Sequence, residues 1–245
     1  MKNITLAICM AAASSAATAD TILGFDASLG VWIPSYDGGI GSDDFAIESF
    51  NPAEDNITFI QAALEHPVPL IPNVMVAHSN IETNGDTTLS ETARFGDLYF
   101  PADSTVGMNL DLSYTDATFY YELLDNWVNL DLGLTARRYD GQLDVASNLQ
   151  TETVELAGYL PMLYGMARFD LPFTGWSIIA QGNGTGYKGG SVTDLTAKVR
   201  WDFAPVLDLG LEAGYRTMNM NLKRIDELGT DLDISGAYIG LNLHL

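Results

Sequence analysis

Apolar residues recur at every second position through most of this chain. The last nine residues, 237–245, place apolar side chains at the odd-numbered positions, and residues 23–33 show the same alternation before Pro34. A period of two puts successive side chains on opposite faces of a β-strand, so each such strand has one apolar face. The pattern therefore predicts an all-β fold.

The N-terminus indicates export. Lys2 precedes a short apolar run, and an Ala-Thr-Ala sequence ends at Ala19. A charged start, a short apolar core and an A-x-A site are typical of a secretory signal peptide. We therefore expect residues 1–19 to be cleaved and residues 20–245 to form one barrel domain. The single cysteine, Cys9, lies in the signal, so the mature chain is predicted to have no disulfide and no thiol chemistry.

An exported chain with this alternation can enter a membrane only as a closed barrel. After the signal, no run of apolar residues approaches the ~20 that a transmembrane helix needs. Lipid offers no hydrogen-bond partner to a free backbone group, so a spanning β-sheet must close on itself. The sequence predicts a transmembrane up-and-down antiparallel β-barrel in the outer membrane of a Gram-negative bacterium.

The turns between the predicted strands fall into two alternating classes. Short turns rich in proline, asparagine, aspartate or aromatic residues occur at 66–72, 125–127, 171–175 and 203–205. Longer polar segments occur at 35–55, 84–104, 140–150 and 221–230, with a tight reversal at Gly189-Gly190. Bacterial barrels have short periplasmic turns and longer outer loops. The alternation favours ten strands with both termini in the periplasm, or eight if 56–79 belongs to an outer loop.

The apolar row changes phase within one predicted strand. Apolar side chains occupy even-numbered positions over 106–114 but odd-numbered positions over 119–123. A shift of one residue moves every side chain to the other face of a sheet. We therefore expect a β-bulge at Thr115-Asp116 within a single long strand, with a very tight turn as the alternative.

The row opposite the predicted lipid face carries charges of both signs. A barrel of about eight to ten strands is just wide enough for side chains to fill it, whereas aqueous bores take about 16 strands or more. We therefore predict an interior filled by paired charges, with a narrow channel for small solutes as the alternative. The predicted network consists of Asp111, Glu122, Asp131, Arg137, Glu155, Lys198, Arg200, Asp208, Glu212 and Arg216.

Composition excludes several function classes. The chain carries 32 acidic and 11 basic residues, a formal net charge of −21, and such a surface repels nucleic acid. The acidic segment 35–55 matches no EF-hand spacing, so we expect it to attract loosely held divalent cations rather than to form a specific metal site. No cofactor is predicted.

Catalysis is not expected. An activated nucleophile needs a base within reach and a third group that orients the base. Of the three histidines, only His78 is expected near the outer rim, where some outer-membrane barrels are hydrolases. Its neighbours Ser79 and Asn80 supply at most a weak triad. A rim hydrolase is therefore the least favoured function.

Two segments resemble a known group of proteins. Residues 65–73 are Glu-His-Pro-Val-Pro-Leu-Ile-Pro-Asn, and residues 124–134 are Leu-Asp-Asn-Trp-Val-Asn-Leu-Asp-Leu-Gly-Leu. With them, the mature chain resembles a family of small Gram-negative outer-membrane β-barrel proteins of unassigned function. The resemblance implies a fold and a location and brings no catalytic residues. Leu245 departs from the aromatic residue that commonly ends such chains.

Together these patterns predict a monomeric barrel with a structural or surface-interaction role exerted through acidic outer loops. Its expected partners are outer-membrane lipid and lipopolysaccharide. During biogenesis, the barrel-insertion machinery is the third expected partner.

Overall fold

The computed structural model describes residues 23–41, 52–53, 55–95, 97–187, 190–204, 209–225 and 228–245. The predicted signal peptide lies outside these residues. The described elements are β1 (Gly24–Gly41), β2 (Ile57–Glu65), β3 (Asn73–Asn80), β4 (Glu82–Thr88), β5 (Ala93–Phe95), β6 (Leu98–Phe100), β7 (Thr105–Asp111), β8 (Tyr114–Leu124), β9 (Val128–Ser147), β10 (Thr151–Leu171), β11 (Trp176–Tyr187), β12 (Gly190–Ala204), β13 (Leu209–Ile225) and β14 (Leu228–His244). Among the described residues, no helix is long and apolar enough to cross a membrane.

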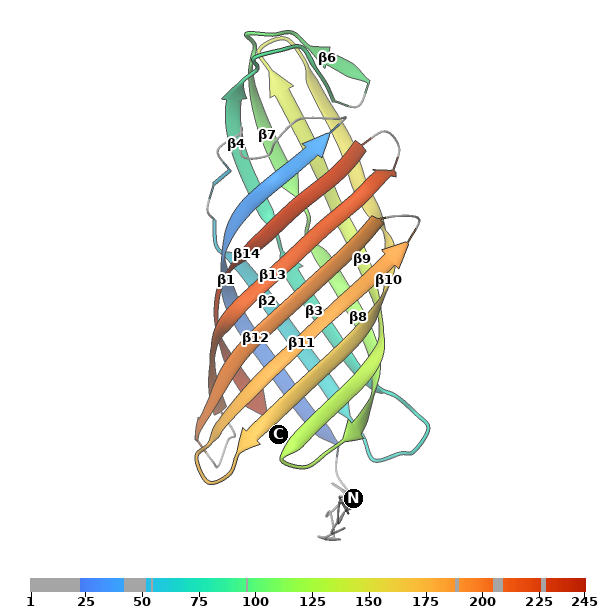
Figure 1. The fold of residues 1–245 in the computed structure, drawn as a ribbon, viewed down its shortest axis with the longest axis vertical. Helices are drawn as coiled ribbons and strands as arrows, with labels where there is room; N and C mark the ends of the chain where they lie inside the picture. Colours follow the sequence, from blue (N-terminus) through green and yellow to red (C-terminus); the bar gives the residue numbers. More distant parts are fainter. Residues whose placement is uncertain are drawn as a thin grey trace, which may run out of the picture.

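In the described part of the chain, ten antiparallel strands close into a barrel (Figure 1). Two of the ten are interrupted: Ile81 separates β3 from β4, and Leu112-Ser113 separates β7 from β8. The breaks lie side by side, because the Leu112 N–H donates to the Ile81 carbonyl over 2.8 Å. β7 and β8 pair with β9 in one continuous register, and β14 pairs with β1 to close the ring. The prediction of ten strands is confirmed.

The half of the barrel nearest the chain termini has an apolar outer surface. On β1, Leu29 is 57% exposed whereas the adjacent Ser28 is 2% exposed. Such an outward apolar belt with an inward polar row is the wall that a bilayer covers. We call this belt the apolar band. It comprises Leu29, Ile33, Ile60, Val76, Phe119, Leu132, Leu134, Leu163, Ile178, Leu195, Val199, Leu211, Ile239 and Leu241.

Beyond the apolar band, the chemistry of the two faces inverts while the strands keep their orientation. Even-numbered side chains of β7 and β8 point inward throughout, and Leu110, Tyr114 and Thr118 are all buried. The register of β8 against β9 is unbroken at Thr115-Asp116, so the predicted β-bulge is wrong. The apolar row changes phase because the wall leaves lipid. Where water surrounds the barrel, burial of apolar surface favours the inside.

Parts of β4, β7, β9 and β10 continue past the other strands as an extension, with the β5–β6 hairpin at its far end (Figure 1). β9 and β10 are the longest strands, with 20 and 21 residues. Turn-forming pairs such as Asn84-Gly85 and Asp140-Gly141 lie within paired strands here, so the predicted outer loops are too long. Strands occupy part of each of the four predicted outer loops, 35–55, 84–104, 140–150 and 221–230.

The interior contains three layers along the barrel axis. Farthest from the termini lies an apolar cluster, which we call the distal core. A layer of charged side chains follows, and a cavity lies at the end that carries the termini. The distal core includes Trp32, Ile57, Ile81, Leu89, Phe100, Leu110, Leu143, Val192, Met218 and Leu232. The segment between β4 and β7 therefore folds inward, since it contributes Leu89 and Phe100.

Candidate functional site

The middle layer of the interior begins with two arginines that share one aspartate. Arg137 makes a bidentate pair with Asp116, at 2.8 Å for both bonds, and also donates to Asp194 Oδ2 over 2.8 Å. Arg216 donates to both oxygens of Asp194, at 2.9 and 2.8 Å, and to the Tyr114 hydroxyl. All five side chains are buried. Two guanidinium groups thus face two carboxylates, and their formal charges cancel.

A second charge cluster lies nearer the termini. Glu212 accepts hydrogen bonds from Lys198 Nζ at 2.8 Å, Arg200 Nε at 2.8 Å and the Tyr238 hydroxyl at 3.0 Å. Arg200 also lies 3.5 Å from Asp26 Oδ2. This cluster also has two cations and two carboxylates. We call the two clusters together the central charge layer.

Contacts of the central charge layer cross the lumen. Arg216 on β13 donates to Ser79 Oγ on β3 over 3.2 Å, and Tyr114 on β8 donates to Asp194 on β12 over 2.8 Å. The Arg216 guanidinium also lies 4.7 Å from the ring centroid of Trp32, which belongs to the distal core. A void of about 40 Å³ remains between these groups. The central charge layer therefore links strands on opposite sides of the barrel.

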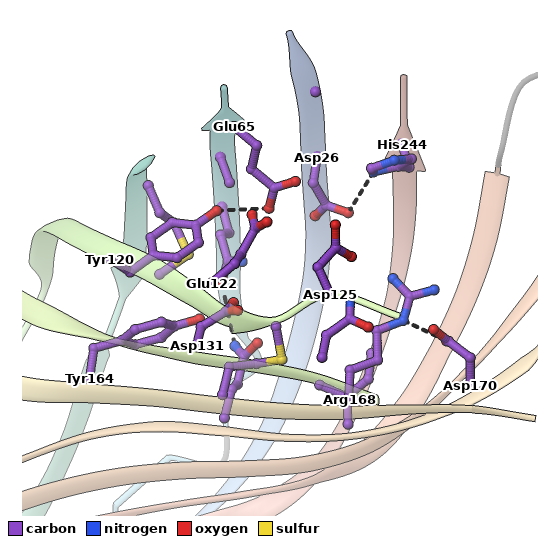
Figure 2. Close-up of a pocket in the computed structure, with 18 of the residues that line it drawn as sticks. Asp26, Glu65, Tyr120, Glu122, Asp125, Asp131, Tyr164, Arg168, Asp170 and His244 are labelled. Atoms are coloured by element: carbon purple, nitrogen blue, oxygen red, sulfur yellow. Dashed lines mark hydrogen bonds and ion pairs between the residues drawn. The ribbon is translucent and has the colours of Figure 1, made fainter. Parts of the chain in front are cut away.

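The third layer is a cavity of about 450 Å³ at the end that carries the termini. We call it the terminal cavity (Figure 2). Four carboxylates line it on β2, β8, β9 and the β8–β9 turn: Glu65, Glu122, Asp131 and Asp125. Glu65 accepts from the Tyr120 hydroxyl at 2.8 Å, and Glu122 accepts from an Asn73 amide at 2.8 Å. Within the described residues, none of these four carboxylates makes an ion pair.

Asp131 is the most enclosed of the four. It is 3% exposed, and its Oδ1 has no hydrogen-bond partner in the described structure. Its register partner on β8 is Glu122, and its register partner on β10 is Met166. Directly opposed like charges destabilise a pair of strands. The buried Oδ1 of Asn129, which lines the same cavity, also lacks a partner.

On the remaining wall of the terminal cavity, acidic side chains lie beside basic ones. Asp26 lies 3.7 Å from His244 Nδ1, and Arg168 Nε lies 2.7 Å from Asp170 Oδ1 (Figure 2). Apolar surface comes from a small cluster beside the carboxylates. That cluster comprises Ala63, Met75, Tyr120, Tyr164 and Met166. Among the described residues, no group of three or more His, Cys, Asp or Glu side chains is arranged to hold a metal ion.

The structure separates the predicted charge network into three groups. The residues found in the central charge layer are Arg137, Lys198, Arg200, Glu212 and Arg216. Glu122 and Asp131 line the terminal cavity without a cationic partner. The prediction that Asp111 and Glu155 face the lumen is wrong. Both point outward on the extension, where apolar side chains occupy the inward positions. Asp208 lies outside the described residues.

Sequence reasoning missed two acidic members of the central charge layer. Asp194 shares its strand phase with Lys198 and Arg200, so alternation alone was a sufficient signal for its inward position. Asp116 was obscured because it lies at the apparent change of phase. His78, the candidate for rim catalysis, points outward and its Nδ1 lies 3.1 Å from the Thr115 hydroxyl.

No family model and no curated protein sequence matches this chain. Among solved structures, it is similar to the transport unit of the autotransporter AIDA-I from Escherichia coli, with 10% identity, 91% of this chain and 88% of the other covered, and a TM-score of 0.41. It is also similar to Ail, the attachment invasion locus protein of Yersinia pestis, with 11% identity, coverages of 90% and 99%, and a TM-score of 0.34. The P. putida toluene transporter TodX shows 9% identity, coverages of 91% and 89%, and a TM-score of 0.31. All three are Gram-negative outer-membrane β-barrels.

Proposed function

We propose that this protein is a non-enzymatic barrel of the Gram-negative outer membrane, closed to solutes, which acts at the cell surface through its extension. The observation that carries the proposal is the order of the three layers inside the barrel along its axis. A bracing charge layer and a distal apolar core occupy the lumen between the terminal cavity and the far end. A bore filled by side chains transmits no solute. The proposed role is therefore interaction with partners at the outer surface.

The extension offers an acidic, exposed surface for such contacts. Its outward positions include Asp140, Asp144 and Glu155, and Tyr159 is 76% exposed beside them on β10. Carboxylates attract divalent cations, which also bind the phosphates of lipopolysaccharide. We propose lipopolysaccharide and outer-membrane lipid as the partners of this surface. We further propose that the protein is a monomer and is inserted by the barrel-insertion machinery.

Site-specific labelling tests the location and the orientation together. The only cysteine of the chain is Cys9, so a single new cysteine in the chain after residue 19 reports one position. Tyr159→Cys on the extension should react with a membrane-impermeant maleimide on intact cells. Leu70→Cys, in the exposed turn between β2 and β3, should react only after the outer membrane is permeabilised. Labelling of Leu70→Cys on intact cells would reverse the proposed orientation.

Planar-bilayer recording tests closure. The purified protein should give no unitary conductance, because the central charge layer blocks the bore. Arg200→Ala removes one contact to Asp26 on β1 and one to Glu212, its register partner on the neighbouring strand β13. The variant should therefore lower the stability of the barrel or open a small conductance. Defined unitary steps in the unchanged protein would instead support the narrow channel.

A further inference from the structure

The terminal cavity holds carboxylates that the fold leaves without counter-charges. In the central charge layer, every acidic side chain lies within 3.5 Å of an arginine or lysine nitrogen. In the terminal cavity, Glu65, Glu122, Asp125 and Asp131 make no ion pair with any described residue. Arg168, Arg200 and His244 also line the terminal cavity, but they pair with Asp170, Glu212 and Asp26 and leave these four carboxylates unpaired.

Asp131 is the most deeply buried of these unpaired carboxylates. The side chain is 3% exposed and lines the cavity, yet its Oδ1 has no hydrogen-bond partner in the described structure. Its two register partners are an acid, Glu122, and a thioether, Met166. A buried carboxylate without a partner is costly, and a cation supplied from outside would offset that cost.

The geometry selects an organic cation over a metal ion. No three acidic or histidine side chains among the described residues converge closely enough to hold a metal. The carboxylates instead line a cavity of about 450 Å³, within the size range of pockets for small organic ligands. Met75, Met166 and the rings of Tyr120 and Tyr164 provide apolar wall between them. Aromatic rings also attract ammonium groups.

We propose that the terminal cavity binds a linear aliphatic polyamine. One ammonium group lies between Asp131 and Glu122, and another contacts Glu65 or Asp125 towards the mouth. The methylene chain between them packs on the methionines and tyrosines. Figure 2 shows Glu65, Glu122, Asp125 and Asp131 around the shared space that such a molecule would occupy. This inference goes beyond the proposed surface role and does not depend on it.

Calorimetric titration of the protein in lipid nanodiscs with spermidine tests the proposal. Binding should be one to one and should weaken as salt is raised, since salt screens partly exposed charges. The double variant Asp131→Asn/Glu122→Gln should bind about tenfold more weakly or worse, the loss expected when hydrogen bonds to charged groups are removed. Met166→Lys places an internal ammonium beside Asp131 and should abolish binding. Glu155→Gln removes one charge from the outward face of the extension and should bind as the unchanged protein does.

Several results would overturn the polyamine site. Absence of spermidine binding would do so, as would an equal loss in Glu155→Gln, which would indicate attraction to net charge alone. If MgCl₂ competes with spermidine at equal concentrations, the site binds a metal ion and the polyamine proposal is wrong. Folding is monitored by thermal unfolding of each variant. If the double variant does not fold, Met166→Lys decides the matter, because retained spermidine binding in that variant refutes the proposed position of the ammonium group.

Discussion

Replacing Asp194 with asparagine should strongly destabilise the barrel. Asp194 accepts hydrogen bonds from Arg137, Arg216 and Tyr114 at 2.8 to 2.9 Å, and it is 5% exposed. After the change, Arg137 keeps its bidentate pair with Asp116, but Arg216 has no ion-pair partner left among the described residues. Removing one partner of a buried ion pair costs about 3–5 kcal/mol. We expect Asp194→Asn to lower the free energy of unfolding by that amount.

Urea titration of the protein in phospholipid vesicles, followed by tryptophan fluorescence, measures this loss. The chain has four tryptophans as reporters. The midpoint should fall at an unchanged dependence on urea, since the surface exposed on unfolding stays the same. Asp231→Asn is the matched control. Asp231 is exposed and accepts one bond of 3.1 Å from Asn221, so its change should stay within about 0.5 kcal/mol.

A second substitution separates charge from packing. Asp194→Asn/Arg216→Met leaves Arg137 and Asp116 as a balanced pair, so the double variant should be more stable than Asp194→Asn alone. If Asp194→Asn lowers the free energy of unfolding by less than about 1 kcal/mol, the central charge layer contributes little to the stability of the barrel. If adding Arg216→Met lowers the free energy of unfolding further, the unpaired Arg216 guanidinium is not the cause of the destabilisation.

The same titration checks three further expectations. Asp131→Asn should raise the free energy of unfolding by up to about 1 kcal/mol, because it removes a like charge from a cross-strand pair, and a loss would contradict this. Gly30→Val should cost about 1–3 kcal/mol, since even a Cβ at this position would lie 2.6 Å from the Tyr238 ring; an unchanged midpoint would refute the close packing. Leu134→Arg in the apolar band should cost about 2–4 kcal/mol, whereas Gln142→Arg, outward on the same strand beyond the band, should be nearly neutral; equal costs would place both positions in one environment.

The barrel itself could be predicted from the sequence because its signal is local. A period of two fixes which side chains share a face, and the apolar row along residues 23–33 marks the lipid side. Within the apolar band, that rule places Arg137, Lys198, Arg200 and Glu212 inside, and the structure has them buried there. No knowledge of which strands are neighbours is needed for this step.

The errors arise where the solvent outside the wall changes. Alternation shows which residues share a face, but it does not show whether lipid or water lies beyond that face. The inward residues of the extension are apolar, so Asp111 and Glu155 were assigned to the wrong side. The same change of solvent imitated a β-bulge at Thr115-Asp116. Burial of Leu143 on β9, the strand whose Leu134 is 62% exposed, shows both solvents acting on one strand.

The character of the candidate site depends on cross-strand register, which alternation does not supply. Arg137 and Asp131 lie on the same strand and in the same phase, yet only Arg137 meets opposite charges. Asp131 meets Glu122 on one side and Met166 on the other, and this follows from the pairings of β8, β9 and β10. A charge-balanced layer and an unbalanced cavity therefore share the same sequence pattern.

The central charge layer and the distal core also lie between the two ends of the barrel. A ligand in the terminal cavity meets the central charge layer, in which every acid is already paired. Bringing a further charge into that layer would disrupt these pairs, so we expect the proposed polyamine to leave by the end through which it enters. The extension lies beyond the distal core, at the end of the barrel opposite the terminal cavity. Among the described strands, β9 and β10 reach from the terminal cavity into the extension without interruption, and the interrupted strands β3–β4 and β7–β8 follow the same course.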